Sequence, residues 1–168
     1  MSSGTATVAS RMPFPFPTRS LARFLFWTVP PPSFKGDIVT PDDPGYSGEI
    51  ARWAVNAERP AGIVAFVKDT NDVALALEYA WMNNLQIATR CGGHASGASS
   101  TKGGLVVDLF CYFNYAVVDL EKHTARMGAG TLCATVEKEA IQYGLASVAG
   151  TVNHVRVDLL MTCTSCQY

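Results

Sequence analysis

The chain lacks the features that mark several large classes of protein. No apolar run approaches the roughly 18 residues that a membrane-spanning helix needs. There is no Asn-x-Ser/Thr sequon, no internal repeat and no low-complexity tract. The five cysteines are an odd number, and only Cys163 and Cys166 lie close together in the sequence. We therefore expect no membrane span and no disulfide framework, although one pair of cysteines could still form a bridge.

The chain also lacks an excess of either charge. Thirteen basic and fourteen acidic residues give a formal net charge of -1. A nucleic-acid-binding protein normally needs a basic face to neutralise phosphates, so we expect no nucleic-acid partner. Hydrophobic residues make up 48% of the 168 residues, which is enough to bury the core of one globular domain.

Acidic residues are missing altogether from the first 36 residues, which are rich in Ser, Thr and Pro and contain four basic residues. This composition is compatible with a transit peptide, but a poorly structured, proline-broken leader without a targeting role is the favoured interpretation. The apolar segment 21–27 is interrupted by Arg23 and has no small-residue cleavage site, which disfavours secretion. The compartment stays unknown: the cytoplasm is favoured and an organelle is possible.

Regular patterns begin near residue 60. Three runs are typical of strands: 63–67, 86–89 and 105–109. A helix is predicted between the first two runs, with Thr70 or Asn71 as its N-cap and its end near residue 83. Together these elements predict a small βαβ layer. The helix is expected to pack through Val73, Leu77, Ala80 and Trp81, and Trp53 is expected to be a packing residue too.

A second mixed α/β unit is predicted from about residue 115. The segments 116–119 and 124–127 flank a short polar turn and predict a hairpin. Thr131 is suited to cap a following helix, which Gly144 is placed to end. Leu132, Val136, Ala140 and Tyr143 would share one side of that helix. Gly128-x-Gly130 is not half of a GxGxxG motif, because Cys stands at position 133.

The loop at residues 90–94, Arg-Cys-Gly-Gly-His, carries most of the chemistry. Adjacent glycines let bare backbone N–H groups approach a ligand and point the same way, which suits a phosphate or a pyrophosphate. His94 directly follows and could reach the reactive end of a cofactor. Taken alone, the same five residues equally suit a tight turn with a solvated histidine.

The order of these motifs resembles a known family. A βαβ unit, the 90–94 loop, the strand at 104–109, Gly128-Ala129-Gly130 and the segment 149–154 follow one another. This is similar to the FAD-binding domain of the vanillyl-alcohol oxidase and p-cresol methylhydroxylase superfamily, and within it to the berberine-bridge-enzyme-like oxidases. The resemblance implies an α+β fold of this type, present as its N-terminal part. The expected divisions are a leader at 1–36, the FAD-binding part at 37–154 and an atypical tail at 155–168.

The resemblance implies FAD as the cofactor and assigns two loops to it. In the family the first loop wraps the FAD diphosphate, and its histidine commonly bonds to the 8α-methyl carbon of the flavin, which makes His94 the expected tether. The other residues implied in the first loop are Arg90, Cys91, Gly92, Gly93, Ala95 and Ser96. Those implied in the second loop are Gly150, Thr151, Val152, Asn153 and His154. Because Val152 stands where some members have a second tethering cysteine, no second covalent link is expected.

The implied reaction is hydride removal from an alcohol, amine or sugar carbon of a small-molecule substrate, with O₂ as the final oxidant. The family's substrate-deprotonating base, often Tyr or Glu, belongs to regions that this sequence lacks. After His154 the expected glycine-rich continuation is absent, so a truncated or mispredicted gene product is our hypothesis. The alternative to an oxidoreductase is an inactive fragment or pseudoenzyme that binds FAD weakly or not at all.

The tail carries Cys163-x-x-Cys166, which invites two further interpretations. A structural zinc site normally needs four ligands, and the nearest extra candidates, His154 and Cys133, have no recognisable spacing. A redox CxxC normally opens a helix of a thioredoxin-like unit, and the surrounding sequence predicts none. We therefore expect no metal site.

Overall fold

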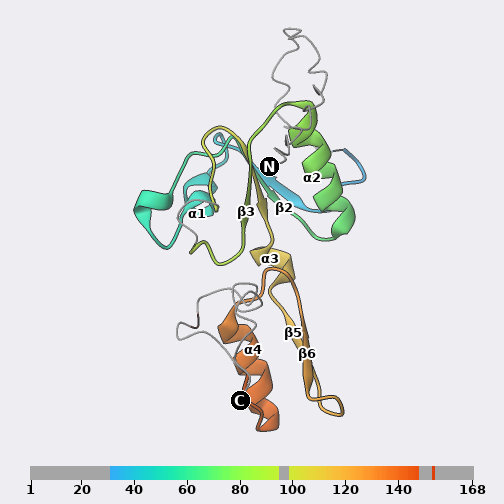
Figure 1. The fold of residues 1–168 in the computed structure, drawn as a ribbon. Coiled ribbons are helices and arrows are strands. Elements are labelled where there is room, and N and C mark those ends of the chain that lie inside the picture. The colour runs from blue at the N-terminus through green and yellow to red at the C-terminus, as the bar shows by residue number, and fades with distance from the viewer. Residues whose placement is uncertain (1–30, 95–98, 148–152, 154–168) are drawn as a thin grey trace, which may run out of the picture.

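A computed structural model describes residues 31–94, 99–147 and 153 of the chain. Two units follow one another in this part of the chain (Figure 1). The first holds a four-stranded sheet with helices, and the second holds a two-stranded hairpin and a helix. The predicted mixed α+β fold, a βαβ layer followed by a second mixed unit, is therefore confirmed.

The four-stranded sheet has the order β1-β2-β4-β3. Strands β2 (Ile63–Phe66), β4 (Leu105–Asp108) and β3 (Ile87–Arg90) run parallel, and β1 (Asp37–Val39) pairs antiparallel with β2 at the edge. The three predicted strands are confirmed, whereas β1 was not predicted. Because β4 lies between β2 and β3, the two strands joined by the crossover helix are not neighbours.

Side chains alternate between the two faces of this sheet. Ile63, Ala65, Leu105 and Val107 pack on one face in a core cluster with Ala76 and Ala80 of α2 (Thr70–Met82). Val64, Phe66, Ala88 and Val106 form the opposite cluster, against which Ile50 of α1 (Tyr46–Ile50) packs. Burial on both faces explains why β2 and β4 are continuous apolar runs, as parallel strands usually are.

Helix α2 differs from its prediction in its cap and in its buried face. Asp69, not Thr70 or Asn71, is the N-cap, and its carboxylate accepts a hydrogen bond from the Asp72 N–H at 2.9 Å. Asp72 itself is fully buried, where its carboxylate accepts from the N–H groups of Lys35 and Lys68. The residues of α2 that are buried are Asp72, Ala76 and Ala80. Of the four residues predicted to pack, Ala80 is buried and Val73 packs against the same cluster, whereas Leu77 and Trp81 are exposed.

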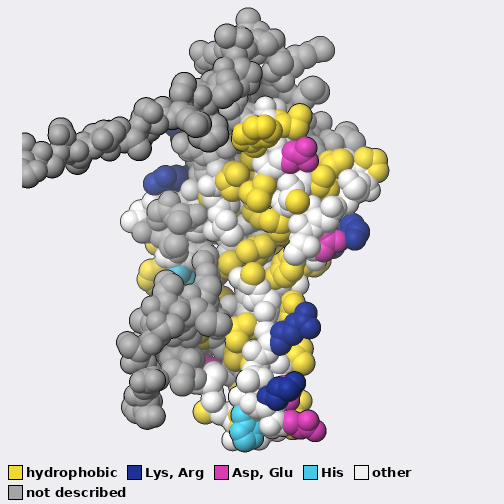
Figure 2. Space-filling model, turned by 45° about the vertical axis from the view of Figure 1, so that its right-hand side comes forward, with side chains coloured by type: hydrophobic (Ala, Val, Ile, Leu, Met, Phe, Trp, Pro, Cys, Tyr) yellow, Lys and Arg dark blue, Asp and Glu magenta, His cyan; other side chains and the backbone are white. Residues whose placement is uncertain are grey.

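The prediction that Trp53 and Trp81 are packing residues was wrong. Their side chains are 75% and 81% exposed, respectively. Trp81 belongs to the outer side of α2 together with Leu77 and Met82, which are also exposed. Figure 2 brings this side of the molecule forward and shows hydrophobic side chains gathered on the surface there.

The second unit begins with the short helix α3 (Phe110–Phe113). The predicted hairpin is confirmed as β5 (Ala116–Asp119) and β6 (Thr124–Met127), and the predicted helix as α4 (Cys133–Ala140) followed by the 3-10 turn η2 (Ile141–Tyr143). Gly144 ends this helical segment with a φ of 69°, in the left-handed region that glycine tolerates.

Thr131 does not cap α4, contrary to expectation. Its hydroxyl lies within hydrogen-bond distance of the carbonyl oxygens of Phe113 and Tyr115, at 3.1 and 2.8 Å. Thr131 thereby connects the residues just before α4 to the residues between α3 and β5. The first turn of α4 is satisfied differently. The Asn114 side chain accepts from the Leu132 N–H, and the Asn153 carbonyl accepts from the Ala134 N–H at 2.9 Å.

Gly128 and Gly130 have a packing role that explains the Gly-x-Gly pattern. A Cβ atom on Gly128 would lie 2.1 Å from the Phe113 carbonyl oxygen, and one on Gly130 would lie 2.1 Å from the Leu109 carbonyl oxygen. The backbone after β6 therefore passes α3 at a distance that only glycine permits.

The start of the core lies within the predicted leader. Phe34 is buried in the α2-side cluster, and the Lys35 N–H is bonded to Asp72. The division of the chain at residue 36 stays a prediction, but the side chain of Phe34 packs with the sheet that follows.

We predict that Gly130→Ala lowers the free energy of unfolding by about 1–3 kcal/mol, the usual cost of overpacking. Its Cβ would meet main-chain atoms that cannot rotate away. Gly48→Ala is the control, because Gly48 lies in α1 with nothing within 4 Å of an added Cβ. Urea denaturation of both variants tests this, and equal stability of the two would contradict the packing role.

Candidate functional site

The candidate loop begins at the carboxyl end of the parallel strands. Arg90, the last residue of β3, is paired in register with Asp108, the last residue of β4. Both share the sheet face that α1 covers, since they continue the alternation of Ala88 and Val106. In open α/β sheets ligands bind outside this edge, where the strand order changes.

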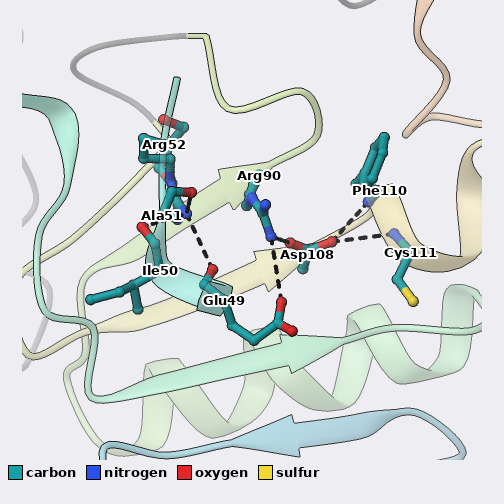
Figure 3. Close-up of polar contacts among 9 residues, drawn as sticks. Glu49, Ile50, Ala51, Arg52, Arg90, Asp108, Phe110 and Cys111 are labelled. Carbon is teal, nitrogen blue, oxygen red and sulfur yellow. Dashed lines mark hydrogen bonds and ion pairs between the residues drawn. The ribbon is translucent and has the colours of Figure 1, made fainter. Parts of the chain in front are cut away.

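Arg90 and Asp108 form a buried ion pair at this edge. Arg90 Nη1 lies 2.7 Å from Asp108 Oδ2, and the Asp108 side chain has no exposed surface. The other carboxylate oxygen, Oδ1, accepts from the N–H groups of Phe110 and Cys111, at 2.9 and 3.4 Å, at the start of α3. Glu49 of α1 approaches Arg90 Nη1 at 3.9 Å (Figure 3). One carboxylate thus fixes the ends of two strands and the direction of α3.

A second arginine lies beside the first. Arg52 is only 7% exposed, and its Nη1 donates to the carbonyl oxygens of Glu49, Ile50 and Ala51, at 3.3, 2.8 and 2.8 Å. Its Nε donates to the Ser99 carbonyl at 2.8 Å, on the far side of the candidate loop. Burial lowers the pKa of Arg52, and the nearby positive charge of Arg90 lowers it further. A guanidinium group still keeps its proton at neutral pH.

The glycines of the loop lie against these arginines. Gly93 has a φ of 70°, which disfavours any other residue, and a Cβ there would lie 3.4 Å from Arg52 Cδ. Cys91 is buried, and its Sγ donates to the Ala129 carbonyl at 3.2 Å. The loop is therefore joined to α1's side of the sheet through Arg52 and to the second unit through Cys91.

His94 is half-buried and stacks on an aromatic ring. The imidazole and the Trp53 indole have centroids 5.3 Å apart and ring planes 25° apart. This is the distance range of stacked aromatic pairs. The stack joins the end of the loop to the segment that follows α1.

These residues surround a cavity of about 290 Å³. Its lining consists of Ala51, Arg52, Trp53, Arg90, Cys91, Gly92, His94, Phe110 and Leu132. A neighbouring cavity of about 630 Å³ shares Arg90 and Phe110 with it and is also lined by Asp37, Glu49 and Asp108. Arg90 of the ion pair thus lines both cavities, and Asp108 lines the larger of the two.

Two buried donors at this place have no acceptor within the described residues. They are Arg52 Nη2 and Arg90 Nε. A buried charged donor without a partner is costly, so it is a natural position for an anionic ligand oxygen. The residues present therefore fit a phosphate-bearing ligand.

Most of the predicted site residues that the structure describes lie close together, and the other predicted site residues lie outside the described part of the chain. Arg90, Cys91, Gly92 and His94 line one cavity, and Gly93 packs beneath them on Arg52. Asn153 bonds to the first turn of α4, next to Leu132 of the same cavity. The remaining predicted site residues, Ala95, Ser96, Gly150, Thr151, Val152 and His154, lie outside the described residues, as do Cys163 and Cys166.

Sequence reasoning missed Arg52 and Trp53 as site residues. Arg52-Trp53 follows a short helical segment without any recognisable motif, and its partner Ser99 is 47 residues away. An arginine between apolar residues, directly before a tryptophan, was the available signal. Among the described residues, no group of three His, Cys, Asp or Glu side chains could hold a metal ion. No helix in that part of the chain is long and apolar enough to cross a membrane.

Comparison with known proteins gives consistent matches. The FAD binding domain family model matches residues 61–157, more than half of the chain. (R)-6-hydroxynicotine oxidase of Paenarthrobacter nicotinovorans is 35% identical over 122 residues, which is 71% of this chain and 26% of that protein. An uncharacterised FAD-linked oxidoreductase of Bacillus subtilis, YgaK, is 33% identical over 121 residues, 71% of this chain and 27% of its own length. The chain thus spans about a quarter of the length of these curated relatives.

Solved structures show the same fold. The crystal structure of 6-hydroxy-D-nicotine oxidase from Arthrobacter nicotinovorans superposes with a TM-score of 0.71 at 33% identity, over 75% of this chain and 28% of that one. The berberine-bridge-enzyme-like 1 protein of Physcomitrella patens superposes with a TM-score of 0.65 at 20% identity, over 74% of this chain and 28% of that one. The second likeness concerns the fold alone.

We predict that Asp108→Ala destabilises the chain by about 3–5 kcal/mol, because it leaves the Arg90 charge buried without its partner. Asp108→Asn keeps the size of the side chain and is expected to be destabilising as well, since the charge is still lost. Lys122→Ala removes an exposed ion pair with Asp119 instead and should leave the melting temperature unchanged. If Lys122→Ala and Asp108→Asn lower the melting temperature equally, the buried pair does not have the structural importance that we assign to it.

Proposed function

Because the chain belongs to the FAD binding domain family of FAD-linked oxidoreductases, within the vanillyl-alcohol oxidase and p-cresol methylhydroxylase superfamily, we propose that it forms the flavin-holding part of an oxidase. FAD is the cofactor of this family. The single observation that carries the proposal is the pair of unpartnered guanidinium donors on Arg52 and Arg90, beside the cavity that His94 lines.

The diphosphate is the part of FAD that fits this cavity best. Arg52 Nη2 and Arg90 Nε offer two charged donors, and guanidinium groups form strong hydrogen bonds to phosphate oxygens. Gly92 and Gly93 add backbone without side chains to the same wall. In this proposal Ala95, Ser96 and the segment 150–154 complete the binding loops.

His94 is the proposed covalent tether. Its imidazole nitrogen would bond to the 8α carbon of a bound FAD, in place of its own N–H proton and of one hydrogen of that carbon. The two electrons and two protons released would be taken up by O₂, which becomes hydrogen peroxide. The tether would hold the cofactor in one orientation, so that its isoalloxazine ring faces the substrate in a fixed position.

The proposed reaction is oxidation of an alcohol, amine or sugar carbon. FAD, when bound, would supply the hydride-accepting chemistry for this oxidation, with O₂ as the final electron acceptor and hydrogen peroxide as its product. The substrate's N–H or O–H proton has to leave at the same stage, and a base outside the described residues is proposed to take it. The (R)-6-hydroxynicotine oxidase relative makes an amine the first substrate class to test.

A second candidate is a fragment that holds FAD without turnover. The exposure of Trp53 favours it, because in the described residues this side of the cavity has no cover against water. Oxidation of a substrate bound there needs a site from which water is excluded. We therefore expect the chain alone to take up FAD and to turn over little or no substrate.

We predict that the purified chain is yellow and that flavin fluorescence stays with its band on a denaturing gel. His94→Ala should lose the fluorescent band and still bind FAD reversibly, because the arginine donors remain. His123→Ala is the matched control and should keep the band, since His123 lies in the β5–β6 turn away from the cavity.

A colourless chain that takes up no added FAD would contradict the proposal and support an inert fragment. Retention of the fluorescent band in His94→Ala would contradict the assignment of the tether but not the binding of FAD.

A further inference from the structure

The placement of the Trp53 indole is unusual for an exposed tryptophan. Three quarters of its surface is accessible, so the core does not hold it. Its ring nevertheless lies on the imidazole of His94, with centroids 5.3 Å apart and planes 25° apart. Both rings line the cavity that Arg52 and Arg90 also line. This contact therefore belongs to the candidate site and not to the packing of the fold.

The chain holds Trp53 through the residue before it. The N–H group of Arg52 donates to Glu58 Oε1 at 3.2 Å, and the Arg52 guanidinium donates to four carbonyl oxygens, those of residues 49–51 and Ser99. The Arg52 side chain also lies beneath Gly93, one residue before His94. The segment 52–53 thus runs along the segment 93–94: Arg52 lies under Gly93, and Trp53 lies against His94.

The stack with Trp53 restricts the rotation of the His94 imidazole about its χ2 torsion. The χ2 torsion of histidine is broad and roughly two-fold, so an imidazole at a cavity mouth can present either of its nitrogens in many directions. The indole of Trp53 favours orientations of the imidazole close to its own plane, since the two ring planes are 25° apart in a stacked pair. Bond formation at one ring nitrogen depends on that direction.

We propose that Trp53 is a positioning residue for His94: its indole face fixes the plane of the imidazole for attachment to the flavin. This inference rests on the proposed tether. Trp53 also lines the cavity proposed for FAD, so its substitution can change the affinity for FAD as well. The mark of a positioning role is a loss of attachment rate that exceeds the loss of affinity.

The first test measures attachment in the full chain. Apoprotein is mixed with saturating FAD, and covalent flavin is followed on denaturing gels over time. Trp53→Leu should attach flavin about 3- to 10-fold more slowly, the range expected from the loss of one aromatic stack. Trp53→Phe should restore most of the rate because it keeps a flat ring. Trp81→Leu is the control: it removes an equally exposed tryptophan that does not line the cavity.

The affinity of the same variants for FAD separates positioning from binding. Combined with His94→Ala, so that no attachment occurs, Trp53→Leu should lose less affinity for FAD, relative to the His94→Ala protein, than it loses in attachment rate. A large loss of affinity with an unchanged rate of attachment would overturn the inference, since Trp53 would then contact FAD itself.

A second measurement needs no flavin. In a chain whose other tryptophans, Trp27 and Trp81, are changed to Phe, Trp53 is the only indole emitter. His94→Ala should then change the intensity or the wavelength of its emission, because the substitution removes the ring that contacts the indole. Unchanged emission would contradict the stack.

The outcomes distinguish the inference from the proposed function. Normal attachment in Trp53→Leu, with a tether in the unaltered chain, overturns the positioning role alone. No attachment in the unaltered chain overturns the tether, and the positioning role with it.

Discussion

The ion pair between Arg90 and Asp108 is the interaction on which the site depends. It links the carboxyl ends of β3 and β4, and the same carboxylate holds the first turn of α3. The loop that follows Arg90 and the helix that follows Asp108 therefore leave the sheet from one fixed point. Arg90 and Phe110, one from each of these segments, line both cavities. A buried pair is a weak source of stability, but it is a strong constraint on where the chain goes.

In the proposed site, each of the two arginines uses some of its nitrogens for the fold and keeps one for the ligand. Each has one part of its guanidinium committed to the fold, through Asp108 or through backbone carbonyls, and one buried nitrogen without an acceptor in the described residues. Burial lowers the pKa of Arg52, and the neighbouring positive charge of Arg90 lowers it further. In the proposed site an anionic diphosphate would offset both effects, because it would bring negative charge to the two guanidinium groups.

The sequence predicted the parts of the fold that are encoded locally and missed those that depend on distant contacts. The apolar runs of β2 and β4, the hairpin and the stop at Gly144 need only neighbouring residues, and all were predicted. Strand β1 is three residues long with one exposed residue, so it carries too little pattern to be found. The inward face of α2 was predicted only in part: Val73 and Ala80 pack on the core, but Asp72, a charged residue, is buried there by bonds from the N–H groups of Lys35 and Lys68. Arg52 and Trp53 were missed for the same reason: their roles come from Ser99 and His94, more than forty residues away.

The central claim is that the end of this sheet recognises the anionic part of FAD through buried guanidinium donors. Competition titrations with ADP and with riboflavin test it most directly, in the His94→Ala protein, where binding is reversible. If the claim holds, ADP displaces FAD, its affinity falls as salt is added, and riboflavin competes poorly. Displacement of FAD by riboflavin but not by ADP would contradict it, because recognition would then lie with the flavin ring and not with the arginines.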